Sequence, residues 1–198
     1  MTQSTSSCSR TASAAFRRSG AGRWAALAAV LALFLAVPSA CTWGRPDDAE
    51  LWRQVDAMYD SYRVRNFPDV AEISPQDAMA LAGRDPGKVV FIDVRPDEER
   101  RVSTIPGSVR ADVFLANVEQ YRGMLGVAFC TISYRSGELL EELGGELDGV
   151  RLANLQGGLL GWVHAGGALV DDRGEPVKRL HVFGSRWDLA PQGYETVW

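Results

Sequence analysis

Two residues with complementary chemistry, Cys130 and Arg135, lie close together in the chain. A cysteine thiolate is a strong nucleophile, and the arginine guanidinium binds anions through a fixed fork of N–H donors. The stretch FCTISYRSGELL, which holds both, allows two interpretations. Cys130 is either a small buried hydrophobic residue in front of a turn, or a nucleophile in a loop that handles an anion.

Strand and helix patterns alternate around this pair, which predicts an α/β domain with a central, mainly parallel sheet flanked by helices. Apolar runs rich in β-branched residues are typical of buried parallel strands, and capping residues mark helix starts. Strands are predicted at KVVFIDV (88–94), GVAFC (126–130) and VRLANL (150–155). Helices are predicted at ISPQDAMALAG (73–83), with Ser74 as N-cap, and at SGELLEELGGEL (136–147), the latter interrupted by Gly144 and Gly145. A turn is predicted at QGGLLGW (156–162).

The loop after the second strand is well placed to hold a negative charge. Ligands of parallel sheets bind beyond the carboxyl ends of the strands. With Cys130 ending a strand and a helix starting near Ser136, the loop Thr131–Tyr134 lies over a helix N-terminus. Its N–H groups and the helix dipole would stabilise a thiolate, and Arg135 would add anion binding. No histidine is required for this kind of activation.

The first 40 residues have the pattern of an export signal. An arginine-bearing leader precedes the 14-residue apolar run WAALAAVLALFLAV, residues 24–37. This run is short for a membrane span, which needs about 20 apolar residues. Ser39 and Ala40 before Cys41 resemble a bacterial lipobox, so we expect residues 1–40 to be a leader and Cys41 to be lipidated, with the protein in the cell envelope or periplasm. Ordinary cleavage near Ala40 and an uncleaved anchor are the alternatives.

Cysteine count and charge exclude several classes of function. Cys8 leaves with the leader and Cys41 is expected to carry lipid, so Cys130 is the one thiol left, too few for a disulfide framework or a multi-cysteine metal site. We also expect no metal and no cofactor. The leader holds four of the 21 basic residues and none of the 25 acidic ones. The remaining acidic chain disfavours nucleic acid as a partner, and membrane contact is expected only through the leader or lipid anchor.

Four motifs, in order, resemble the rhodanese (thiosulfate sulfurtransferase) homology domain. Together they cover about residues 66–170, after a linker helix at 41–65 and before an aromatic C-terminal extension at 171–198 that we expect to pack on the domain. The motifs are FIDVRPDEER with Asp93 and Arg95, TIPGSV with Ile105, Pro106 and Gly107, the loop CTISYRS, and NLQGGLLGW with Gly157, Gly158 and Trp162.

The resemblance implies a sulfurtransferase or persulfide carrier. Cys130 would accept sulfane sulfur from a thiosulfate-like donor and pass it to a thiophilic acceptor such as cyanide or a thiol, without a cofactor. Arg135 would help to bind the anion, while Asp93 and Arg95 would brace the neighbouring turn. The substrate-binding positions would be Thr131, Ile132, Ser133, Tyr134 and Ser136.

The loop also bears on the alternatives. Four residues separate Cys130 from Arg135, as in the sulfurtransferase loop, whereas the related phosphatases use one residue more, so a phosphatase is the weaker enzyme hypothesis. Active family members often have arginine at the position of Thr131 and glycine at that of Ser133. If position 133 requires a positive φ, its serine is strained. A rhodanese-fold binding or sensing module with little turnover is the alternative function.

Overall fold

A computed structural model describes residues 45–198. The expected leader, the lipidation residue Cys41 and the first residues of the linker lie outside the described residues. Within the part that is described, no helix combines the length and the apolar character that a membrane crossing requires.

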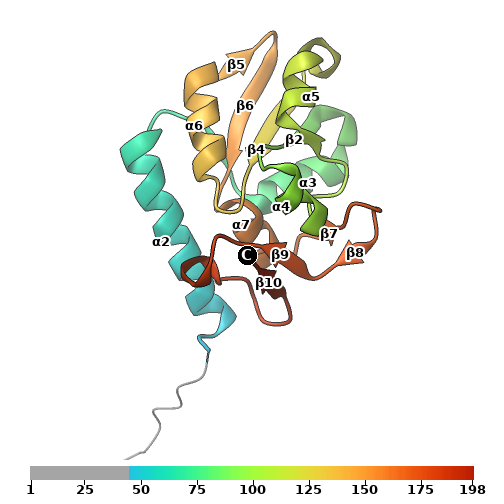
Figure 1. Cartoon of the computed structure of the whole chain (residues 1–198). Helices are drawn as coiled ribbons and strands as arrows, with labels where there is room; N and C mark the ends of the chain where they lie inside the picture. The colour runs from blue at the N-terminus through green and yellow to red at the C-terminus, as the bar shows by residue number, and fades with distance from the viewer. Residues whose placement is uncertain (1–44) are drawn as a thin grey trace, which may run out of the picture. The chain divides into compact units, whose positions relative to one another are not determined.

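A six-stranded sheet lies at the centre of this part of the chain (Figure 1). The strand order is β1-β6-β4-β2-β3, and these neighbours pair in parallel, while the short β5 pairs antiparallel with β6. The α/β class with a mainly parallel sheet flanked by helices is therefore confirmed. The strands of this sheet are β1 (Glu72–Ile73), β2 (Val89–Asp93), β3 (Val109–Arg110), β4 (Leu125–Phe129), β5 (Glu146–Leu147) and β6 (Val150–Leu155).

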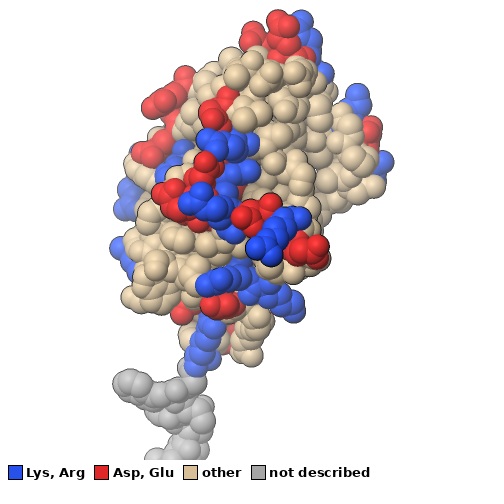
Figure 2. Space-filling model, turned by 45° about the vertical axis from the view of Figure 1, so that its right-hand side comes forward, with Lys and Arg blue, Asp and Glu red and all other residues tan. Residues whose placement is uncertain are grey.

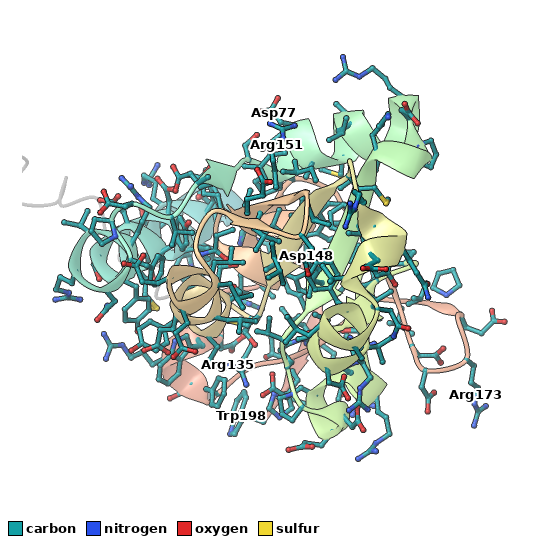
Figure 3. The ribbon with its side chains drawn as sticks, turned by 90° about the horizontal axis from the view of Figure 1, so that it is seen from above. Asp77, Arg135, Asp148, Arg151, Arg173 and Trp198 are labelled. Carbon is teal, nitrogen blue, oxygen red and sulfur yellow. The ribbon has the colours of Figure 1, made fainter. Side chains whose placement is uncertain are left out.

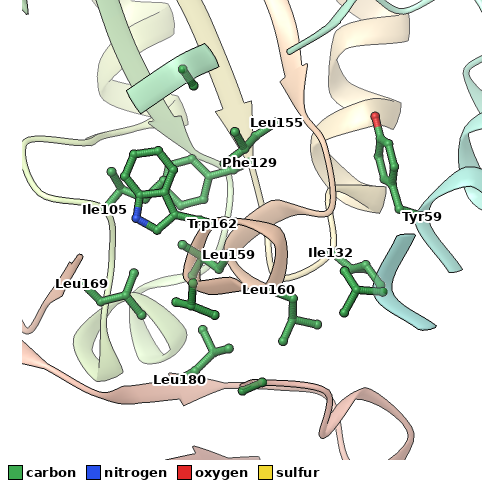
Figure 4. Packing of buried hydrophobic residues seen from close by; sticks show 14 of the residues in the cluster. Tyr59, Ile105, Phe129, Ile132, Leu155, Leu159, Leu160, Trp162, Leu169 and Leu180 are labelled. Atoms are coloured by element: carbon green, nitrogen blue, oxygen red, sulfur yellow. The ribbon is translucent and has the colours of Figure 1, made fainter. Parts of the chain in front are cut away.

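Helices cover both faces of the sheet because its strands are apolar on both sides. Val89 and Phe91 of β2 face a core shared with α2, α3 and α7, whereas Val90 and Ile92 face a second core shared with α5 and α6. Figure 4 shows part of the first core, which includes Trp162 and Phe129. The ring of Trp162 lies edge to face with that of Phe91, with centroids 5.2 Å apart. The helices are α2 (Asp48–Asn66), α3 (Pro75–Arg84), α4 (Asp97–Val102), α5 (Ala111–Ala116), α6 (Tyr134–Leu143) and α7 (Gly158–His164), with 3-10 turns η1 (Pro86–Lys88), η2 (Val118–Tyr121) and η3 (Ser185–Trp187).

Helix starts follow the capping residues in the sequence. The side chain of Ser74 accepts a hydrogen bond from the N–H of Asp77, and Pro75 is the first residue of α3. Helix α2, expected as a linker helix, buries Leu51 and Val55 in the first core and lies against α6 and α7. It is thus an integral part of the described unit.

Two local predictions are wrong. The helix predicted over residues 136–147, with an interruption at Gly144 and Gly145, ends at that interruption instead of continuing beyond it. Its last residue is Leu143, Gly144 has a φ of 75°, and residues 146–147 turn back as β5 beside β6. The segment predicted as a turn at 156–162 contains helix α7 instead. Only Gln156 and Gly157 form the turn, and the helix begins at Gly158. Gly157 and Gly158 have φ of 68° and 59°, and the apolar residues after them are buried in the helix.

The C-terminal extension packs on the domain through Leu180, Val182 and Leu189, which are buried in the first core. Figure 1 shows its strands gathered near α7 at one end of the sheet. Strand β9 pairs in parallel with β10, and β7 pairs antiparallel with β8. These strands are β7 (Leu169–Val170), β8 (Pro176–Val177), β9 (Arg179–His181) and β10 (Glu195–Val197).

Candidate functional site

Cys130 lies at the base of a pocket of about 360 Å³ at the carboxyl end of β4. The strand ends at Phe129, so Cys130 is the first loop residue and not the last strand residue, as predicted. Helix α6 begins at Tyr134 and not near Ser136, so Arg135 belongs to the first helical turn. Cys130 is only 2% exposed. Its thiol is thus buried, as the core interpretation requires, and also borders a cavity, as the nucleophile interpretation requires.

The first turn of α7 holds the carbonyl side of the loop. The N–H of Leu159 donates to the carbonyl of Cys130 at 3.0 Å, and the N–H of Leu160 donates to the carbonyl of Thr131 at 3.1 Å. This close approach requires glycine at position 158, because a side chain there would overlap the carbonyl of Cys130 and come within 2.8 Å of the N–H of Ser133. The Gly-Gly motif therefore shapes the cysteine loop.

Asn154, on the neighbouring strand β6, holds the other end of the loop. Its amide nitrogen donates to the carbonyl of Ser133 at 2.9 Å, and its amide oxygen accepts from the Ser136 hydroxyl at 2.7 Å. All three residues are fully buried. Because each amide group of Asn154 serves a different loop residue, the side chain fixes the spacing between the loop and the first turn of α6.

The amide side of the same loop is free. Among the described residues, no acceptor takes a hydrogen bond from the N–H groups of residues 131–136, and the first helical bond of α6 runs from Gly137 to Ser133. Six successive donors at a helix start form a concave site for negative charge. Ser133 makes this curvature possible by adopting the left-handed region, with φ of 59° and ψ of 27°. Its buried hydroxyl has no hydrogen-bond partner.

Arg135 pairs with Glu99, a residue that the sequence analysis did not single out. Two bonds of 2.8 and 2.9 Å join the guanidinium to the Glu99 carboxylate, whose side chain is 4% exposed. Burial opposes the charge of Arg135, but the hydrogen bonds and charges of Glu99 and Cys130 outweigh it and raise the pKa of Arg135. The guanidinium is therefore charged, lines the same pocket as Cys130, and is already matched by one carboxylate. The side chain of Arg135 is labelled in Figure 3.

Glu99 also connects the C-terminal extension to the loop. The ring nitrogen Nδ1 of His181 lies 3.9 Å from the carboxylate, and the Thr131 hydroxyl lies 3.5 Å from both Glu99 and the carbonyl of His181. One sequence signal could have identified Glu99. It belongs to the acidic run after β2, and the carboxyl ends of adjacent parallel strands β2 and β4 meet at the same edge.

Asp93 and Arg95 form a buried ion pair beside the site. The guanidinium donates to both carboxylate oxygens at 2.9 and 2.7 Å, and it also bonds the carbonyl of Ser103 at 2.7 Å. The hydroxyl of Thr104 donates to the same carboxylate at 2.7 Å. This pair ties β2 to the segment before β3 and does not reach the pocket, so its geometry is that of a brace.

Aromatic side chains form two walls of the pocket. Tyr62 of α2 and Tyr134 of α6 stack edge to face with ring centroids 5.0 Å apart on one side. Phe183 and Trp187 of the C-terminal extension stack in the same way at 6.1 Å on the other. The Phe183 ring also covers the Arg135 guanidinium at 4.7 Å. These residues are far apart in the chain, so no pattern of helical spacing in the sequence could have predicted that they line the same pocket.

The predicted substrate-binding positions divide into two groups. Thr131, Ile132 and Tyr134 line the pocket with Cys130 and Arg135. The side chains of Ser133 and Ser136 do not line it, and both are buried.

In residues 45–198, no group of three or more His, Cys, Asp or Glu side chains is arranged to hold a metal ion. On the face seen in Figure 2, basic and acidic side chains are interleaved.

Comparison with known proteins finds partial similarities. No family model matches the sequence. The chain is 28% identical over 145 residues to the HTH-type transcriptional regulator Rv0324 of Mycobacterium tuberculosis, over 66% of this chain. It spans only 61% of the length of that curated relative.

Similar solved structures include proteins with different described functions. The thiosulfate sulfurtransferase of Pseudomonas aeruginosa is 20% identical, with a TM-score of 0.49 over 66% of this chain and 24% of that one. A rhodanese-related protein of Thermoplasma volcanium is 20% identical, with a TM-score of 0.40 over 50% and 97%. A Rhodopseudomonas palustris protein described as a possible tyrosine phosphatase is 23% identical, with a TM-score of 0.43 over 57% and 91%. The activity of this chain must therefore be argued from its own site.

Proposed function

We propose that the protein is a sulfurtransferase or persulfide carrier whose sulfur-bearing residue is Cys130. The observation that carries the proposal is the free amide side of the cysteine loop. Six successive N–H groups, from Thr131 to Ser136, have no acceptor among the described residues, and they follow directly after Cys130, which lines a pocket. A persulfide attached to Cys130 would bring a charged terminal sulfur into this ring of donors.

The chemistry requires only groups that this site contains. The Cys130 thiolate would attack the outer sulfur of a sulfane donor, forming a persulfide and releasing the remainder of the donor with the electron pair. The loop N–H groups would stabilise the charge on the terminal sulfur, and the Arg135 guanidinium would add a nearby positive charge. An acceptor, a thiol or cyanide, would then take the terminal sulfur and restore the thiolate.

Intact mass tests the proposal directly. After incubation with a sulfane donor and removal of small molecules, the purified protein is expected to gain one sulfur, about 32 Da. The Cys130→Ser variant is expected to gain nothing, and cyanide or a thiol should remove the added mass from the wild-type protein. Failure of thiosulfate, persulfide and polysulfide donors alike to load Cys130 would refute the proposal.

One observation favours a second candidate, a binding or sensing module with little turnover. Arg135 is already paired with the buried carboxylate of Glu99, so its charge is not fully free for a substrate anion. In that case Cys130 would still be present but would not cycle. Loading without release to any acceptor over many minutes would favour the module, whereas repeated transfer would favour the enzyme.

A phosphatase fits the loop less well. Four residues between Cys130 and Arg135 make a narrower bowl than the loop of the related phosphatases, which has one residue more. Hydrolysis of a phosphate ester that is lost in Cys130→Ser would reverse this ranking.

We also propose that the protein is exported and held at the cell envelope through its N-terminus. The apolar run at 24–37 and the lipobox-like residues before Cys41 support this proposal. Cys41→Ala is expected to shift the protein from the membrane fraction to the soluble fraction. An unchanged distribution would contradict lipidation while leaving the role of Cys130 untouched.

A further inference from the structure

We propose that the sulfur donor of this site is an organic persulfide with an apolar, uncharged body, and that Glu99 and the aromatic walls select it over anionic donors such as thiosulfate. The inference rests on the proposed sulfurtransfer and specifies its substrate class. Two independent features carry it, the charge state of the pocket and the composition of its walls.

The pocket offers little uncompensated positive charge to an anionic donor. Arg135 is the one cation among the residues that line it, and Glu99 occupies the guanidinium through two hydrogen bonds. Thr131, next to the nucleophile, is uncharged and contacts the same carboxylate at 3.5 Å. A dianion entering the pocket would have to approach the buried Glu99 carboxylate or displace it from Arg135, and both are unfavourable in a poorly solvated site.

The walls suit an apolar group. The paired rings of Tyr62 with Tyr134, and of Phe183 with Trp187, come from different elements and enclose the space above Cys130. A pocket of about 360 Å³ has room for one aromatic ring or a short alkyl chain. Phe183 is 53% exposed even though it is large and apolar, and its ring also contacts the Arg135 guanidinium and the ring of His181. A donor body placed between the two pairs of rings would cover this exposed surface.

The reaction balances with such a donor. The Cys130 thiolate attacks the outer sulfur of R–S–SH, a bond forms between the two sulfur atoms, and the original S–S bond breaks. The leaving group is the thiolate R–S⁻, which takes the electron pair, and Cys130 becomes the persulfide Cys130–S–SH. Its proton can be lost to solvent, and the loop N–H groups then face the charged terminal sulfur. No external oxidant or reductant is needed.

Two persulfides with the same reacting atoms separate the donor body from the sulfur chemistry. Benzyl persulfide carries an apolar ring, and 2-carboxyethyl persulfide carries a carboxylate. The rate of sulfur loading on Cys130 of the full chain is followed by intact mass, and each rate is divided by the rate of the same donor with a small free thiol. We expect the corrected benzyl rate to exceed the carboxyethyl rate about tenfold, equivalent to about 1.4 kcal/mol in transition-state binding.

Variants assign the preference to its residues. Phe183→Ala and Trp187→Ala remove one wall and are expected to lower the benzyl-to-carboxyethyl ratio at least threefold. Leu115→Ala, which truncates an exposed hydrophobic residue outside the pocket, should leave the ratio unchanged. Glu99→Gln should raise loading by thiosulfate and by the carboxyethyl donor. If Glu99→Gln does not fold, the wall variants decide the question.

The outcomes separate the two proposals. Equal corrected rates, or faster loading by the carboxyethyl donor or thiosulfate, would overturn the donor class and leave the sulfurtransferase proposal standing. An unchanged ratio in both wall variants would overturn the assignment of the selection to these aromatic residues. If none of the donors loads Cys130, the proposed function itself fails.

Discussion

Replacing Ser133 by glycine should stabilise the protein. Ser133 has a left-handed backbone, with φ of 59° and ψ of 27°, and its fully buried hydroxyl has no hydrogen-bond partner. The left-handed conformation costs a residue with a Cβ about 1–2 kcal/mol, and an unpaired buried hydroxyl costs about 1–3 kcal/mol. Glycine removes both terms and loses roughly 0.5–1 kcal/mol through the entropy of the unfolded chain. We therefore expect a net gain of about 2 kcal/mol in the free energy of unfolding.

Urea unfolding followed by tryptophan fluorescence measures this gain, since the chain has six tryptophans. The midpoint should rise without a change in the m-value, and the melting temperature should rise by about 5 °C. Ser133→Ala is the matched control, because it removes the hydroxyl but keeps the Cβ in the left-handed region. It should recover only the hydroxyl part, about 1 kcal/mol. If glycine is no more stabilising than alanine, the backbone at position 133 is not strained; if glycine destabilises the protein, the whole argument is wrong.

Three further substitutions test the contacts around the loop, each by urea unfolding. Gly158→Ala should lower the free energy of unfolding by about 2–4 kcal/mol, because Gly158 has a positive φ and a side chain there would overlap the cysteine loop. The control is Gly174→Ala: Gly174 also has a positive φ but open space around it, so the loss should be only about 1 kcal/mol. Asn154→Ala should lose about 2–4 kcal/mol because the Ser133 carbonyl and the Ser136 hydroxyl lose their partner; an unchanged midpoint would show that Asn154 does not hold the loop. Asp93→Asn should lower the free energy of unfolding by about 3–5 kcal/mol, because it leaves the Arg95 charge unmatched. The control is Arg110→Gln, which breaks an exposed ion pair and should cost less than about 1 kcal/mol. A loss as small as that in Asp93→Asn would contradict the role of the Asp93–Arg95 pair as a brace.

Many of the strands and helix starts can be predicted from the sequence because local patterns determine them. Continuous apolar runs predict the strands β2 and β4, since a strand buried on both faces has no polar side. Ser74 and Pro75 mark the start of α3, because the Ser74 side chain accepts a hydrogen bond from the N–H three residues later and proline suits the first helical position. The order of strand, loop and helix likewise places Cys130 at the carboxyl end of a strand.

Two local predictions are wrong because contacts outside the segment decide the structure. The apolar residues after Gly158 could be a turn or a helix, and only their burial in the first core, with residues of β4, β6 and α2, makes the helix favourable. Residues 146–147 leave the helical pattern because β6 offers a hydrogen-bonding edge, which no short stretch of sequence can reveal.

By itself, then, the sequence determined the α/β framework, the position of Cys130 and the spacing to Arg135. Only the tertiary structure decided what surrounds them. Glu99 lies 36 residues before Arg135 in the chain yet neutralises it, and Phe183 lies on a C-terminal segment yet covers it. Such contacts are decided by the packing of whole elements and carry no local pattern. The nucleophile is therefore readable from its neighbours in the chain, whereas the chemical character of its pocket depends on neighbours in space.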